Sequence, residues 1–147
     1  MKITRVVTGS DERSHFEEEE LAFTEQRPGA ALSAPIAVRS AVFRRSSQEA
    51  NDGIEALHVT GKRLLVVKLA GQTEIEVGDG ARRIFGPGSV HFLEDTHGEG
   101  HRGRLLSEDS LTLILELAPE HPEAPGSQAA PGRPERPGDP RSPGASE

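Results

Sequence analysis

Residues 90–104, VHFLEDTHGEGHRGR, hold the densest group of potentially reactive side chains in this sequence. Three histidines, three acids and three glycines fall within these fifteen residues. Imidazole and carboxylate groups are common ligands of divalent metals in proteins. The same composition also fits a polar loop at the rim of a pocket without metal. Which of the two applies depends on the elements that position this stretch.

The segments around this stretch read as short strands separated by Gly-rich turns. RLLVVKLA (63–70) is a continuous apolar run, typical of a strand buried on both faces. QTEIEV (72–77) alternates in polarity, and Asp79-Gly80 after it predicts a hairpin turn. About seven strands are expected between 35 and 117, with others in KITRVV and SHFEEEELAF, and no convincing helix. The eight candidate segments in this range are PIAVRSAVFRRS, IEALHVT, RLLVVKLA, QTEIEV, ARRIF, SVHFLE, HRGRLLS and SLTLILEL. The pattern predicts an all-β sandwich or barrel.

The C-terminal segment 118–147 differs from the rest of the chain. It contains eight of the eleven prolines and no Leu, Ile, Val or Phe. Such a segment cannot bury enough apolar surface to offset the entropy of ordering, so we predict a disordered tail with polyproline II character. The tail is expected to be dispensable for the fold, although its PxxP spacing is compatible with a protein-interaction role. The folded domain is predicted over 1–117, with its core over 35–117.

Composition excludes several classes of partner. The formal net charge is −7 and the basic residues are scattered, which argues against nucleic acid as the main partner. The chain has no cysteine, so it has no disulfide framework and no thiolate metal site. No apolar run is long enough to span a bilayer, and the N-terminus lacks the apolar region of a secretion signal. We expect a soluble, cytoplasmic protein without membrane or nucleic-acid partners.

The segment from 53 to 71, GIEALHVTGKRLLVVKLAG, resembles the first sequence block of the cupin family. That block has a glycine, an H-x-H pair, a Glu and a closing glycine. Gly71 fits the closing glycine, Leu64 stands at the Glu position, and the H-x-H pair becomes His58 and Thr60.

The second cupin block is similar to FGPGSVHFLEDTHGEGH, with Gly88 as the turn and His101 as the final His. The resemblance implies a small bacterial single-domain cupin, built as a jelly roll of the double-stranded β-helix type. Cupins generally bind a divalent metal through these His and Glu positions, which project into the barrel.

Two of the four usual ligand positions are lost here, at Thr60 and Leu64. His58 and His101 would supply two ligands for Fe, Mn, Ni or Zn, whereas a catalytic metal usually needs three. His97 is the first choice for the third ligand, because Gly98 and Gly100 would let the loop turn inward. The other candidates are Glu99, Asp95, Glu94 and the strand residue His91.

Two functional classes remain open at this point. In the first, a small polar molecule binds in a metal-free or degenerate pocket lined by His58, Thr60, Leu64 and His101, without catalysis. In the second, a metal held by His58, His101 and a loop residue supports an enzyme of the dioxygenase, isomerase or epimerase kind. Exposed strand edges and the habit of cupins make a homodimer the expected assembly.

Overall fold

The computed structural model describes residues 1–49 and 56–120 as an all-β chain. Within these two ranges there is no helix, and so none long and apolar enough to cross a membrane. The strands, in chain order, are β1 (Lys2–Thr8), β2 (Ser14–Glu20), β3 (Phe23–Arg27), β4 (Ala30–Ser33), β5 (Val38–Ser47), β6 (Leu64–Ala70), β7 (Thr73–Glu76), β8 (Arg82–Phe85), β9 (Val90–Leu93), β10 (Arg102–Leu105) and β11 (Asp109–Leu117).

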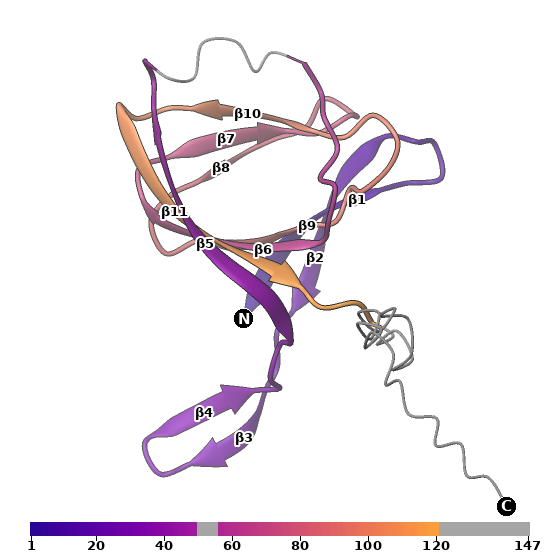
Figure 1. Cartoon of the computed structure of the whole chain (residues 1–147). Helices are drawn as coiled ribbons and strands as arrows, with labels where there is room; N and C mark the ends of the chain where they lie inside the picture. Colours follow the sequence, from indigo (N-terminus) through magenta and orange to yellow (C-terminus); the bar gives the residue numbers. More distant parts are fainter. Residues whose placement is uncertain (50–55, 121–147) are drawn as a thin grey trace, which may run out of the picture.

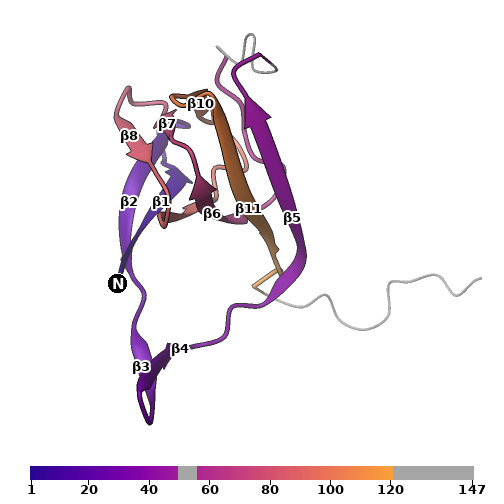
Figure 2. The same cartoon turned by 90° about the vertical axis from the view of Figure 1, so that its left-hand side faces the viewer.

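The strands form three separate sheets (Figure 1). The large sheet has the order β2-β1-β9-β6-β11-β5, and only its β1–β9 pair is parallel. The small sheet has the order β10-β7-β8 and faces part of the large one. The third sheet is the hairpin β3–β4, which projects from the body of the molecule in both views (Figures 1 and 2). The strands of the described ranges do not join into a closed barrel, so the all-β prediction is confirmed but the barrel is not.

Both faces of the large sheet carry apolar side chains. On the inner face, toward the small sheet, Val6 packs with Ile75, Val77 and Phe85. On the outer face Ile3, Leu65 and Phe92 form a second cluster, joined by the partly buried Leu21, Val90, Leu115 and Leu117. Because side chains alternate along a strand, β1 contributes Ile3 to one cluster and Val6 to the other. The central position of β6 confirms the prediction of a strand buried on both faces.

The predicted strands are mostly present between 35 and 117. Seven of the eight candidate segments contain a strand, β5 to β11. The β7–β8 hairpin turns at Asp79-Gly80 as predicted, with Gly80 at a φ of 88° and a backbone bond from Val77 N to Ala81 O. The predicted strand at 54–60 is wrong over its described part, where only His58 makes an isolated bridge.

Two other predictions concern the ends of the chain. The single segment SHFEEEELAF is split, because β2 ends at Glu20 and a new hairpin begins at Phe23. The turn of that hairpin is at Pro28-Gly29, where Gly29 has a φ of 76°. The last strand ends at Leu117, and the predicted tail beyond residue 120 lies outside the described residues.

Candidate functional site

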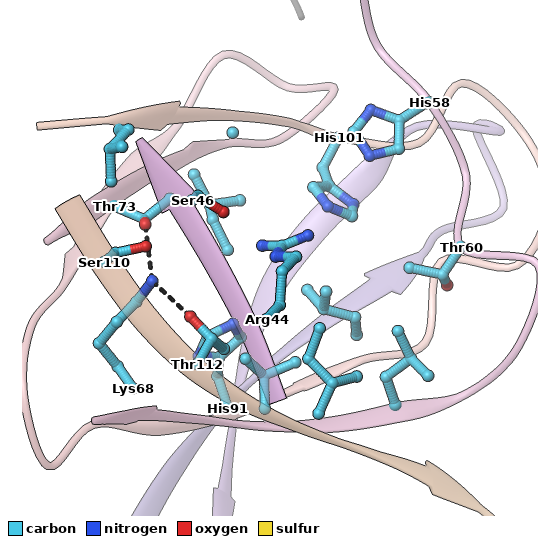
Figure 3. A pocket seen from close by; sticks show the side chains of 17 residues that line it. Arg44, Ser46, His58, Thr60, Lys68, Thr73, His91, His101, Ser110 and Thr112 are labelled. Atoms are coloured by element: carbon cyan, nitrogen blue, oxygen red, sulfur yellow. Dashed lines mark hydrogen bonds between the residues drawn. The ribbon is translucent and has the colours of Figure 1, made fainter. Parts of the chain in front are cut away.

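A cavity of about 350 Å³ lies between the large and small sheets (Figure 3). Strands β5, β6, β9 and β11 form one wall, β7 and β10 the other, and residues 58–60 the rim. Its apolar lining residues are Leu64, Val66, Ile75, Leu93, Leu105 and Ile114. A volume of this size is at the lower end of the range for small-molecule sites.

Two cationic side chains enter this cavity from strands β5 and β6, which flank β11 in the large sheet. Thr112 on β11 pairs directly with Arg44 on β5 and with Lys68 on β6. Directly paired residues point to the same face of a sheet, so the strand register alone places the three side chains side by side. Both cations line the cavity.

Lys68 is almost completely buried, with 2% of its surface exposed. Its Nζ donates to Thr73 Oγ1 at 2.8 Å and to Thr112 Oγ1 at 2.9 Å, so its hydrogen-bond partners are neutral hydroxyls (Figure 3). Burial, and then the nearby charge of Arg44, lowers the pKa of Lys68 below the ordinary lysine value. Among the described residues that line the cavity there is no Asp or Glu to balance these charges.

His91 lies at the floor of the cavity as a neutral imidazole. It is buried against the ring of Phe85, with ring centroids 4.1 Å apart. Burial, followed by the charges of Lys68 and His101, lowers the pKa of His91 to about 3. Its Nδ1 has no hydrogen-bond partner within the described part of the chain, and the same is true of Thr60 Oγ1 at the rim. Buried polar atoms without partners are uncommon, and here two of them line one cavity.

His58 and His101 converge, as the sequence predicts. Their backbones form an antiparallel bridge, with bonds of 2.8 Å and 2.9 Å, and their ring centroids are 4.9 Å apart. All four residues of the predicted pocket, His58, Thr60, Leu64 and His101, line the same cavity.

Asp95 holds His101 in place. Its Oδ2 lies 2.6 Å from His101 Nδ1, and both side chains are buried. This contact occupies Nδ1, so Nε2 is the nitrogen left for a ligand. The sequence offers Asp95 as a metal ligand, whereas the structure makes it the partner of an imidazole.

The residues present do not fit a metal ion. The four positions that the sequence resemblance assigns to a metal supply only two imidazoles, and no group of three His, Cys, Asp or Glu within residues 1–49 and 56–120 is placed to hold one. His97 is exposed outside the cavity, and its carbonyl accepts from Thr8 Oγ1 at 2.8 Å. Glu94 is bound by Arg5 and Arg63, and Glu99 is exposed. A cavity that already contains Arg44 and Lys68 also repels a cation.

Arg44 and Lys68 are the functional candidates that sequence reasoning missed. One signal for Lys68 was available, because a lysine inside the apolar run RLLVVKLA is unusual for a strand buried on both faces. Arg44 carries no such signal, since it is one of a pair with Arg45 on an amphipathic segment. The chain matches no family model and no curated protein, so these side chains carry the functional argument.

Proposed function

We propose that this protein binds a small organic anion in the cavity between its two main sheets. The observation that carries the proposal is the charge of the lining, in which Arg44 and the buried Lys68 have no carboxylate partner among the described residues. Leaving a buried charge unpaired is costly, and a ligand with a carboxylate or phosphate group removes this cost when it binds. The unpartnered His91 and Thr60 can hydrogen-bond polar atoms of the same ligand.

The side chains of the cavity walls indicate the chemistry of the rest of the ligand. Apolar residues suit a short carbon skeleton, and the hydroxyls of Ser46, Thr73, Ser110 and Thr112 suit oxygen substituents. A carboxylic or hydroxy acid, or a small phosphate ester, matches this lining better than a neutral sugar does.

The cupin jelly roll remains part of this proposal as the finer description of the fold. It is supported by the four positions that the resemblance assigns to the pocket, since all of them line the cavity. In such a fold Thr60 and Leu64 replace two metal ligands, which suits a binding site that uses protein cations instead of a metal.

Isothermal titration calorimetry with a panel of small molecules tests the proposal. The panel contains acetate, pyruvate, malate, citrate, glycerol phosphate and inorganic phosphate, with glycerol and glucose as neutral probes. We expect at least one anion to bind, and Arg44→Gln to weaken its binding by about tenfold or more, because a charge-assisted hydrogen bond is worth about 1.5–3 kcal/mol.

Arg45→Gln is the matched control for this measurement. Arg45 is the next residue on the same strand, so its side chain points to the opposite face of the sheet. Its removal changes the net charge equally but is expected to leave the affinity within about twofold, as for a distant exposed charge. Binding of the neutral probes alone, or equal losses in both variants, would contradict an anion site formed by Arg44.

Acid–base catalysis of the isomerase or epimerase kind is a second candidate function, favoured by the Asp95–His101 contact. In this reaction His101 Nε2 takes a proton from the carbon next to the carboxylate or carbonyl of the bound acid, and Arg44 stabilises the enolate. The proton then returns to carbon.

NMR in D₂O measures this activity as deuterium exchange at the C–H groups of pyruvate and malate. Asp95→Asn removes the charge that orients and stabilises protonated His101, and is expected to slow exchange by about a hundredfold. His97→Gln, on the exposed loop, should not alter it. Binding of the anion without exchange in the wild type would leave the protein as a binding module.

A further inference from the structure

The chain has three lysines, and they differ sharply in their surroundings. Lys2 and Lys62 are exposed, whereas Lys68 is almost completely buried and lines the cavity. Lysine is rarely buried unless it is paired with an acid, and the described residues that line the cavity include no acid. A lysine kept in such a place is a candidate for covalent chemistry as well as for charge.

The surroundings of Lys68 favour its neutral amine form. Burial, followed by the charge of Arg44, lowers the pKa of the Lys68 ammonium. In the neutral form its two N–H groups can donate to Thr73 Oγ1 and Thr112 Oγ1, which lie 2.8 Å and 2.9 Å from Nζ (Figure 3). The lone pair of the nitrogen is then left over. A buried amine of this kind is the nucleophile that adds to carbonyl groups.

Arg44 supplies a binding group for a carboxylate beside this amine. Arg44 and Lys68 flank Thr112 in direct register, so both side chains leave one face of the sheet from backbones roughly 10 Å apart. Both side chains are long enough to converge over Thr112, and the charge of Arg44 already acts on Lys68. A planar guanidinium can bind a carboxylate through two parallel hydrogen bonds. A molecule with adjacent carboxylate and carbonyl groups can therefore meet both residues at once.

We propose that Lys68 forms a covalent imine with a 2-oxo acid whose carboxylate is bound by Arg44. This inference rests on the proposed anion site and narrows its ligand to acids that have a carbonyl group next to the carboxylate. The lone pair of Nζ adds to the carbonyl carbon. The two amine protons then leave with the carbonyl oxygen as water, and a C=N bond replaces the C=O bond. The ammonium form attracts the acid, and the neutral fraction reacts with it.

The cavity also protects the imine once it has formed. Water reverses the reaction, so a site that limits the access of water preserves the C=N bond. The Lys68 side chain is 2% exposed, and Val66 and Ile75 are buried apolar residues of the same cavity lining. The exposed Lys62 has no such protection.

Reductive trapping followed by peptide mapping of the full chain tests the proposal. The protein is incubated with pyruvate and sodium cyanoborohydride, which reduces an imine to a stable secondary amine. Trypsin does not cut after a lysine modified in this way, so an adduct on Lys68 appears as peptide 64–82 in place of peptides 64–68 and 69–82. We expect Lys68 to be labelled at least about tenfold faster than Lys62, because burial and Arg44 activate Lys68 and leave an exposed lysine unaffected.

Two variants and one competitor link the adduct to the cavity. Arg44→Gln should slow labelling of Lys68 by about tenfold or more, and Arg45→Gln should leave it within about twofold. Lactate should slow the labelling in the wild type, since it has the same carboxylate but no carbonyl group. Circular dichroism verifies that each variant keeps its strand content.

Calorimetry with pyruvate and lactate separates failure of the imine from failure of the anion site. Binding of these acids without an adduct on Lys68 would overturn the imine and leave the anion site intact. If neither these acids nor the other anions bind and no adduct forms, both proposals are overturned. Equal labelling of Lys68 and Lys62, or labelling of Lys68 that Arg44→Gln does not change, would also overturn the imine.

Discussion

Lys68→Met is expected to raise the melting temperature of the protein and at the same time to weaken its binding of small anions. The ammonium group is buried with two threonine hydroxyls as partners, and the charge of Arg44 acts on it. Methionine fills a similar volume without a charge to desolvate. Replacing buried charges by apolar groups is often neutral or stabilising, and we expect a gain of about 1–2 kcal/mol in the free energy of unfolding. Affinity for the anion should fall by at least about tenfold.

The pH dependence of this gain has a defined sign. The pKa of Lys68 is lower in the folded state than its ordinary value of 10.5. The unfolded chain therefore binds more protons between the two pKa values, and the stability of the wild type rises with pH in that window. The advantage of Lys68→Met should be largest below the folded-state pKa and should shrink as the pH rises toward 10.5.

Thermal denaturation with and without the bound anion measures both effects. Lys62→Met is the control, because Lys62 is exposed and pairs only at the surface with Glu116, at 2.9 Å. Its removal should change stability by less than about 0.5 kcal/mol and leave binding intact. If Lys68→Met were destabilised and still bound the anion like the wild type, Lys68 would be a structural residue.

Fold class was accessible from the sequence because strand patterns and turn residues are local. The alternation in QTEIEV and the Asp79-Gly80 turn identify β7, β8 and the hairpin between them without reference to the rest of the chain. Closure of the sheets into a barrel cannot be predicted from such local patterns. It depends on which strands pair across long separations, and the described strands pair into separate sheets.

The cations of the site depend on register, which the sequence does not determine. A shift of one residue in the pairing of β5 with β11 would turn Arg44 outward and Arg45 toward the cavity. The two arginines are adjacent and chemically identical, so no local signal distinguishes them. His58 and His101 could be predicted because the resemblance to cupins assigns both to one pocket.

The prediction that the chain bends sharply at the loop glycines is confirmed. The reason given for it, that the bend would turn His97 inward, is wrong. Both Gly98 and Gly100 have positive φ, at 77° and 76°. Close approach to other backbone explains them, since Gly98 lies against Glu12 and Gly100 against His58. The loop consequently turns His101 inward and leaves His97 outside.

Gly100→Ala is expected to destabilise the protein by about 3 kcal/mol or more and to remove anion binding. A side chain at φ +76° is strained by about 1–2 kcal/mol in any surroundings. A Cβ at this position would also overlap the carbonyl group of His58, which is backbone and cannot rotate away. Relief of this overlap breaks the bridge between His58 and His101, and so separates two residues of the cavity wall.

Gly80→Ala separates the two contributions in the measured free energy of unfolding. Gly80 has a similar φ of +88°, but a Cβ there meets no atom within 4 Å. Its substitution should therefore cost only the backbone strain of about 1–2 kcal/mol and leave binding unchanged. Equal losses of stability in the two variants would mean that the chain relaxes around residue 100, and that the contact with His58 does not require glycine. A much larger loss at Gly100, together with loss of binding, would show that this one close approach holds the rim of the cavity.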